Sequence, residues 1–459
     1  MKEALQKLIA MATEAGLYSD INLLNNSSSH LVVGKETNNL EKDYEKGIKI
    51  RIWDGEKYLE HAQSSLKEEE LEVSMKKLIA QAKANQEHIS EKKELHIDRT
   101  KKEHDFSSEA KIKLSDMSLE EKTKRLNAFK EKILSYSSDI VNVRVALIEE
   151  TEKSTFANPY KYLSQQIDEA ILVFVLYITA EDKTIRQSYE SFVSNGLEVF
   201  EKAEEELPKR LEKVEAVKKA KRLKGGKYTV VLSPKLSGLL AHESFGHGME
   251  ADTMMRGRCL AKDWLGKRIG SDAINIVDYP AIAGKHGQFF FDAEGNEARK
   301  VYLVKNGIIN EALSDNYSRT ILGFEHASNA RIESFDHKHY VRMSNTYFEA
   351  ADKSEEELFS QVEDGIYITD SSGGMEDPKG WGVQIQGNFG QRIRNGKLVD
   401  EYYDGFTITG FLPEIISNIK GIGKEITIEG GGMCGKGHKE WVRVSEGGPQ
   451  LLISGVTLG

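Results

Sequence analysis

Cysteine is scarce in this chain, which has only two thiols, Cys259 and Cys434, in 459 residues. Two thiols are a poor basis for a disulfide scaffold, so each is left as a metal ligand, a nucleophile or a core thiol. Proline is also rare, at 7 residues, while hydrophobic residues make up 39% and charged residues 30% of the chain. This composition excludes collagen-like and wholly disordered chains.

Long apolar runs are missing as well. The most apolar stretch, AILVFVLYI at 170–178, is far shorter than the roughly 20 residues that cross a bilayer, so it predicts a buried strand and no membrane segment. The opening sequence MKEALQKLIAMATEAG has apolar residues at helical spacing and no uninterrupted apolar core. That pattern is typical of an amphipathic helix rather than a signal peptide, so we expect a cytoplasmic protein.

Positive charge is in deficit. The chain has 63 Lys and Arg residues and 73 Asp and Glu residues, which gives a net charge of −10. A surface that neutralises many phosphates needs the opposite balance, so the charge argues against nucleic acid as a partner.

Glycine is unevenly distributed, because only five of the 39 glycines lie in residues 1–220. A chain of this length predicts two to four domains, and the glycine pattern predicts that they are built differently. We expect an α+β, multi-domain fold with mixed or antiparallel sheets and flanking helices. The predicted domains are an N-terminal α+β domain at 1–95, a central α+β domain at 116–224 ending in a long helix, and a Gly-rich, β-dominated C-terminal domain at 225–459.

Hydrophobic periodicity and turn signals predict the individual elements, with a polar linker at 86–115. Helices are expected at 1–16, 71–84, 118–136, 197–223 and 236–249, with Pro208 as the point where the fourth would break. Strands are expected at 20–24, 30–33, 47–53, 140–149, 153–157, 160–167, 170–179 and 228–234. Two further hairpins are expected to turn at Asn306-Gly307 and Asn395-Gly396.

One predicted helix of the β-rich C-terminal domain contains AHESFGHGME, an H-E-x-x-x-H pattern formed by His242, Glu243 and His247. In H-E-x-x-H zincins, histidines four residues apart hold Zn²⁺ and the glutamate activates a water. Here the histidines are five residues apart, which is about 140° around an ideal helix. A shared metal therefore needs a local widening or a helix end, and Gly246 and Gly248 permit either at low steric cost.

A catalytic zinc usually has three protein ligands and one open position, and the residues alone leave the third ligand undecided. Cys434, between glycines in GGGMCGKGHKE, is the first candidate, because a thiolate is a soft ligand suited to zinc. His438, His337 and His339 are alternatives, although each is in a context more typical of a surface or loop histidine. Cys259 has no comparable context and is expected to be a structural thiol.

Motifs spread over essentially the whole chain occur in a specific order: GIKIRIWDG, AHESFGHGMEAD, DAEGNEARKVYLVKNGII, RMSNTYF, DGIYITDSSGG, NGKLV with GFTITG, and GMCGKG. Together they resemble the TldD/PmbA metallopeptidase family, and its TldD-like, metal-binding branch in particular. The resemblance implies one Zn²⁺ per chain, held by His242, His247 and Cys434, with Glu243 as the catalytic base. The PmbA-like branch lacks this metal motif.

The resemblance also implies an activity. It implies a zinc-dependent metallopeptidase that hydrolyses unfolded or flexible peptides, in which Glu243 activates a zinc-bound water as the nucleophile. It implies an enclosed chamber formed by a dimer, either a homodimer or a heterodimer with a PmbA-like paralogue. The alternatives are a catalytically silent peptide-binding partner subunit and a metal-dependent hydrolase that acts on a non-peptide bond.

Two further expectations come from the residues themselves. Glu250, three residues after His247, could orient an imidazole from behind or be a solvated carboxylate. The segment 371–390 could supply a strand edge that pairs an extended peptide through main-chain hydrogen bonds, although an ordinary internal strand is the simpler interpretation.

Overall fold

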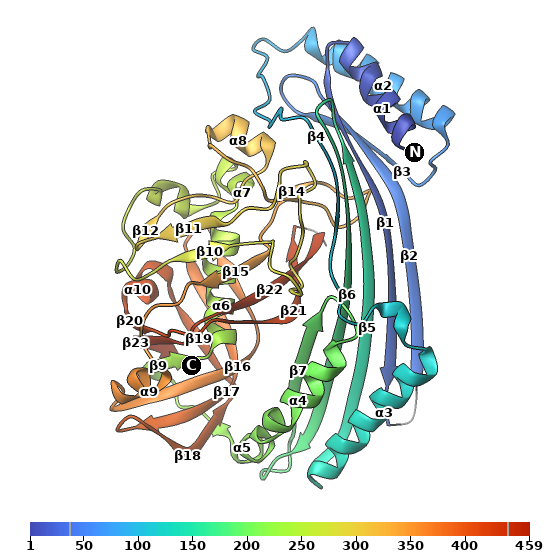
Figure 1. The fold of residues 1–459 in the computed structure, drawn as a ribbon. Coiled ribbons are helices and arrows are strands. Elements are labelled where there is room, and N and C mark those ends of the chain that lie inside the picture. Colours follow the sequence, from blue (N-terminus) through green and yellow to red (C-terminus); the bar gives the residue numbers. More distant parts are fainter. Residues whose placement is uncertain (36–37, 438–439) are drawn as a thin grey trace.

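The computed structural model describes residues 1–35, 38–437 and 440–459. Strands between Tyr18 and Ser194 form one long, twisted sheet, and a β-rich unit built from the rest of the chain lies against it (Figure 1). Helices cover both ends of the long sheet, while the candidate site lies inside the β-rich unit.

The long sheet joins the strands of the first two predicted units. Its order is β3-β2-β1-β5-β6-β4, and β7 pairs with β6. Its strands are β1 (Tyr18–Val33), β2 (Asn38–Trp53), β3 (Tyr58–Gln63), β4 (Lys102–Ser107), β5 (Ile140–Ala157), β6 (Lys161–Thr179) and β7 (Ile185–Ser194). β1 runs antiparallel to β5, from the pair Ile21–Ala157 to the pair Val33–Val145. The two units thus share a sheet, and the boundaries at 95 and 116 stay a prediction.

Several strands are longer than the sequence predicts. The separate strands expected at 20–24 and 30–33 are one strand, β1, and β5 and β6 each merge two predicted strands. Polar residues 25–29 resemble a loop in sequence, but β2 and β5 pair with them on both sides and satisfy their backbone groups. The predicted linker also contains β4, which hydrophobic alternation could not reveal, because most of its side chains are exposed.

The helices of the first part are α1 (Lys2–Glu14), α2 (Glu68–Gln86), α3 (Leu119–Tyr136), α4 (Val199–Leu211) and α5 (Lys213–Lys219), with a short 3₁₀ helix, η1 (Leu114–Asp116). Ser118 caps α3 by accepting a hydrogen bond from Glu121 N at 3.2 Å. The expected long helix breaks at Glu212 rather than at Pro208, which lies inside α4. The buried apolar face of α4 continues on both sides of this proline and holds the helix together.

Three sheets form the β-rich unit. The largest has the order β16-β9-β23-β19-β17-β18-β8, and β16 also pairs with β17, so part of it closes into a ring; β20 pairs with β23. The second sheet has the order β12-β11-β10-β15-β22-β21, and β13 pairs with β14. The strands are β8 (Lys221–Arg222), β9 (Gly226–Leu232), β10 (Ile276–Asp278), β11 (Val301–Lys305), β12 (Ile308–Ile309), β13 (Ala330–Arg331), β14 (Tyr340–Val341), β15 (Asn345–Phe348), β16 (Asp364–Asp377), β17 (Gly382–Arg394), β18 (Lys397–Asp404), β19 (Phe406–Phe411), β20 (Ile419–Ile422), β21 (Thr427–Lys436), β22 (Glu440–Gly448) and β23 (Leu451–Leu458).

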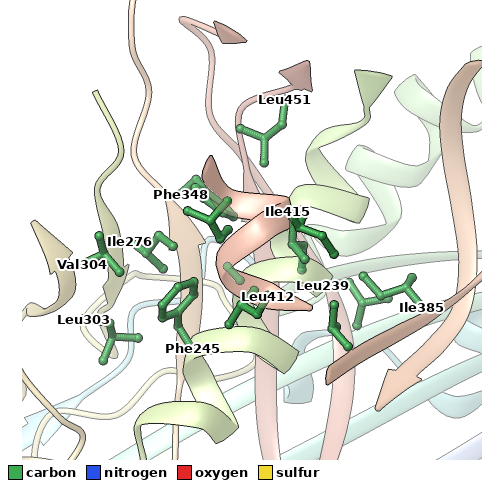
Figure 2. Close-up of a cluster of buried hydrophobic side chains, with 14 of the residues drawn as sticks. Leu239, Phe245, Ile276, Leu303, Val304, Phe348, Ile385, Leu412, Ile415 and Leu451 are labelled. Atoms are coloured by element: carbon green, nitrogen blue, oxygen red, sulfur yellow. The ribbon is translucent and has the colours of Figure 1, made fainter. Parts of the chain in front are cut away.

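The helices of this unit are few and short. They are α6 (Pro234–Ala241), α7 (Ala251–Met255), α8 (Asn316–Leu322), α9 (Glu355–Ser360) and α10 (Leu412–Ser417), with the turns η2 (His242–Gly246), η3 (His247–Met249) and η4 (Leu260–Trp264). α6 and the turn that follows it, which carries Phe245, are buried among apolar side chains from both large sheets, including Ile276, Phe348 and Ile385 (Figure 2). This core fixes the position of the H-E-x-x-x-H segment.

The predicted fold class, α+β with mixed sheets and a β-rich C-terminal part, is confirmed. The two expected hairpin turns are present, and Asn306 and Asn395 both adopt the left-handed backbone that such turns need, each with φ of 49°. Within the described residues, no helix has the length and apolar character required to cross a membrane.

Candidate metal centre

The segment that carries the two histidines begins as an α-helix and then widens. After α6 the chain forms the π-helical turn η2, and the His247 N–H donates to the His242 carbonyl oxygen, five residues earlier. A π turn brings residues i and i+5 together, so the widening that the sequence requires is present.

The two glycines matter because they have no side chain, not because they adopt an unusual backbone conformation. Gly246 has φ of −59°, in the ordinary helical region. A Cβ on Gly246 would lie 3.1 Å from Met343 Cε, and a Cβ on Gly248 would lie 3.1 Å from Trp381 Nε1. The glycines therefore let neighbouring side chains pack closely against the turn.

His242, His247 and Cys434 converge, with candidate ligand atoms all within 4.8 Å of one another. Cys434 Sγ lies 3.0 Å from His247 Nε2, and the two imidazole rings are nearly perpendicular, at 89°. Cys434 lies on β21 opposite Val442 of β22, so residues nearly 200 positions apart meet at one point. Two nitrogens and one sulfur are a donor set that suits Zn²⁺.

The charges of these three side chains are coupled. Burial opposes ionisation of Cys434, but the two imidazoles outweigh it and hold the thiol pKa well below its usual value. Burial likewise lowers the pKa of His242, but the Cys434 thiolate outweighs it and raises the pKa to about 9. The pKa of His247 is raised well above its usual value for the same reasons. The sulfur is therefore a ready-made thiolate ligand.

Cys259 differs from Cys434. Its Sγ donates a hydrogen bond to the Gly248 carbonyl oxygen at 2.8 Å, and burial raises the pKa of its thiol to about 11. A neutral, buried thiol of this kind is a packing group.

A carboxylate lies behind each imidazole. Glu250 Oε2 is 3.6 Å from His247 Nδ1, and Glu446 Oε1 is 3.9 Å from His242 Nδ1. Within the described part of the chain, the buried His242 Nδ1 has no hydrogen-bond partner, and the charge of Glu446, after that of Cys434, raises the pKa of His242. Such carboxylates commonly fix the orientation of ligating imidazoles.

Glu250 also connects the helical turn to the strand of Cys434. It lies 2.8 Å from Lys436 Nζ and 3.4 Å from Arg342 Nε. Arg342 in turn donates to the Cys434 carbonyl oxygen at 2.8 Å. Burial opposes ionisation of Glu250, but Lys436, His247 and Arg342 outweigh it and lower its pKa to about 2.

Glu243 has a second carboxylate beside it, Glu376 of β16. Oxygens of both and a ring nitrogen of His247 lie within 4.8 Å of one another. Burial and the charge of Glu243 raise the pKa of Glu376 to about 7. The sequence interpretation missed Glu376. No sequence motif marks it: Glu376 is on the same face of β16 as Gly374, where an added Cβ would lie 2.7 Å from Glu243 Cγ.

The other predicted histidines lie elsewhere. His337 contacts Glu440 at 2.8 Å and Glu333 at 3.3 Å, and the three form a separate cluster. His339 Nε2 is 3.3 Å from Asn22 Nδ2 of the long sheet. Neither joins His242 and His247, and His438 lies outside the described residues.

Two cavities flank the β21–β22 hairpin. One of about 140 Å³ adjoins the centre and is lined by Glu446, Lys235 and Arg210, with the Gly430–Gly432 bend of β21. The other, of about 190 Å³, lies between the opposite face of the hairpin and the long sheet, and Met433 lines it. The hairpin thus separates the metal-ligand cluster from the larger cavity.

Comparison with known proteins places the chain in a family. The family described as "PmbA/TldA metallopeptidase C-terminal domain" matches residues 225–459. A protein of Methanothermobacter thermautotrophicus named "Metalloprotease" is 31% identical over 70% of this chain and 70% of its own length. The "Zinc metalloprotease TldD homolog" of Saccharolobus solfataricus is 32% identical over 51% of this chain and 52% of its own.

A solved structure supports the fold over the full length. The match to TldE from Thermococcus kodakarensis has a TM-score of 0.78 and 15% identity, and it covers 99% of this chain and 100% of that one. At this identity the likeness concerns the fold alone. The sequence match and the shared fold lead to one conclusion: this chain belongs to the TldD/PmbA family.

Proposed function

We propose that the protein is a zinc-dependent metallopeptidase in which His242, His247 and Cys434 hold one Zn²⁺ and Glu243 is the catalytic base. The observation that carries the proposal is the convergence of the three donor atoms within 4.8 Å, with Glu243 next to one of them in the same turn. The names of two relatives, a metalloprotease and a zinc metalloprotease, support it.

The roles follow from the chemistry of the side chains. A zinc ion at this position would polarise a peptide carbonyl and make a water more acidic. Glu243 accepts a proton from the attacking water and passes it to the departing amine nitrogen. Glu250 and Glu446 orient the two imidazoles so that Nε2 of each faces Cys434.

The proposed substrates are unfolded or flexible peptides, because the strand beside Glu243 has an edge that can pair with one. β9 pairs with β16 only over Gly365–Ile368, while β17 pairs with β16 along its whole length. Among the described strands, none pairs with the other edge of residues 370–377, where Gly374 lies against Glu243. Main-chain hydrogen bonds to this edge would hold an extended peptide across the centre.

We further propose that the working unit is a dimer in the cytoplasm, either a homodimer or a heterodimer with a PmbA-like paralogue. Light scattering of the purified chain, alone and mixed with a candidate paralogue, tests this part separately.

The deciding experiment compares the wild type with Glu243→Ala in zinc content and peptide cleavage. We expect both proteins to hold about one zinc per chain and only the wild type to cleave a flexible peptide. Cleavage by the variant would remove Glu243 from its role. A wild type that binds zinc and peptide without cutting would favour the catalytically silent partner instead.

A further inference from the structure

We propose that Glu376 binds the α-ammonium group of the substrate, so that the protein removes residues from free N-termini as an aminopeptidase. The inference rests on the proposed peptidase function and names its substrate class. Three observations support it: the charge around Glu376, the chain that lies against the end of its strand, and the distances within the cluster.

The first observation is an excess of negative charge beside the proposed metal. Within the described residues, neither Glu243 nor Glu376 has a Lys, Arg or His nitrogen within 4.0 Å, and Glu243 is only 7% exposed. Glu250, in contrast, has Lys436 at 2.8 Å. The charge of a bound Zn²⁺ would be balanced by the Cys434 thiolate and Glu243, which leaves Glu376 without a counter-charge. A partly buried carboxylate of this kind favours a cationic ligand.

The second observation concerns the end of β16 at which Glu376 lies. The Pro378 carbonyl oxygen, just beyond the strand, accepts a hydrogen bond from Leu260 N at 2.8 Å. Trp381 packs on Trp264 of η4 with ring centroids 5.6 Å apart. Leu260 and Trp264 therefore contact the chain just beyond this end of the strand, although the side chains of Asp377 and Lys379 are exposed. A peptide paired with the edge would have a terminus, not further chain, at Glu376.

The third observation is that the distances suit the first peptide bond of a substrate. The α-nitrogen of a peptide lies about 2.5 Å from the carbonyl carbon of the same residue, given N–Cα and Cα–C bonds of about 1.5 Å. Glu376, Glu243 and His247 offer atoms within 4.8 Å of one another. An ammonium held by Glu376 would therefore bring the first carbonyl to Glu243 and the metal ligands. In an internal cleavage, a neutral amide would occupy that position instead.

The experiment uses one flexible peptide in two forms, with a free and with an acetylated N-terminus, and the zinc-loaded full-length protein. Mass spectrometry over time should show the free peptide losing one residue at a time. We expect kcat/KM for the acetylated form to be lower by about tenfold or more, because a charge-assisted hydrogen bond is lost. Glu376→Gln should slow cleavage of the free peptide by a similar factor more than cleavage of the acetylated peptide, so that the preference disappears.

Asp377→Asn is the matched control, since it removes a neighbouring carboxylate that is exposed on the opposite face of β16. It should retain the preference for the free terminus. Binding measured by calorimetry in the Glu243→Ala background, with and without Glu376→Gln, should show the same loss of preference without turnover. Equal rates on the two peptides would overturn the inference and leave the peptidase proposal standing. Cleavage of neither peptide would overturn the peptidase proposal and the inference with it.

Discussion

The backbone N–H of His247 donates to the carbonyl oxygen of His242, which closes a π-helical turn between the two histidines of the motif. An α-helical bond would instead link residues four apart and splay the two imidazoles. The extra residue in the turn is thus what allows an H-E-x-x-x-H sequence to offer two nitrogens to one ion.

Removing the sulfur of Cys434 should weaken metal binding. We expect Cys434→Ser to lower zinc occupancy well below one per chain, because a hydroxyl is a poorer zinc ligand than a thiolate. Metal analysis after dialysis against a weak chelator measures the effect. Cys259→Ser is the control and should keep its zinc, since that thiol bonds to the Gly248 carbonyl oxygen instead. Equal occupancy in the two variants would remove Cys434 from the centre.

Zinc binding should release protons at neutral pH. The pKa of His242 is raised to about 9 in the metal-free protein, and that of His247 is raised too, so both imidazoles are protonated at pH 7. Both must lose a proton to bind, so we expect about two protons per zinc and an affinity that rises from pH 7 towards pH 9. Calorimetry in buffers of different ionisation enthalpy measures the number. Binding without proton release would contradict the thiolate–imidazolium arrangement.

Glu250 should stabilise the fold in a pH-dependent way. Its pKa is lowered to about 2 by Lys436, His247 and Arg342 against the effect of burial. Its contribution is therefore complete above pH 4.5, the usual glutamate pKa, and is lost as the pH falls through about 2. Glu250→Ala leaves Lys436 buried without this partner, and we expect a loss of roughly 3 kcal/mol in the free energy of unfolding at pH 7. Urea denaturation of the metal-free protein measures it. A variant as stable as the wild type would show that the network is not stabilising.

Glu446 should affect metal binding through His242. We expect Glu446→Ala to weaken zinc affinity by about tenfold, because His242 Nδ1 then loses the carboxylate that lies 3.9 Å from it. Glu446→Gln, which keeps an acceptor oxygen, should recover part of the affinity. Glu429→Gln is the control, since Glu429 lies opposite Glu446 on the same hairpin but pairs with Arg210. Competition with a chromophoric chelator gives the affinities, and similar values for Glu446→Ala and the wild type would refute the role.

Close contact between α6 and β22 should be essential. A Cβ on Gly238 would lie 1.9 Å from Gly447 N, a backbone atom that cannot move alone. We expect Gly238→Ala to lower the free energy of unfolding by about 3 kcal/mol or more and to weaken zinc binding, because the helix must shift away from the strand. Gly382→Ala, with no atom within 4 Å of the added Cβ, should change neither quantity. Chemical denaturation measures the free energy of unfolding of the two variants.

Sequence reasoning found the residues whose chemistry is concentrated in short motifs. The histidine spacing and the flanking glycines single out His242 and His247, while Cys434 is only the first of several candidates for the third ligand until the family resemblance implies it. The structure brings the three side chains together. The hairpin turns at Asn306 and Asn395 were equally readable, because local backbone conformation requires those residue types.

What the sequence could not reveal depends on tertiary pairing. Residues 25–29 look like a loop until β2 and β5 lie on either side of them. Glu376 lies in no recognisable motif, and only the packing of β16 against the π turn brings it to Glu243. The steric role of Gly246 could not be predicted for the same reason. Met343, whose side chain would lie close to a Cβ at position 246, is distant in sequence.

The position of Cys434 has a consequence for how the protein is made. The histidines follow β9, whereas the sulfur comes from a hairpin nearly 200 residues later, and β9 itself pairs with the still later β23. A growing chain can thus present the two imidazoles long before the thiolate exists. Tight zinc capture would then begin only when the hairpin has docked, so metal content would report on whether the β-rich unit has finished folding.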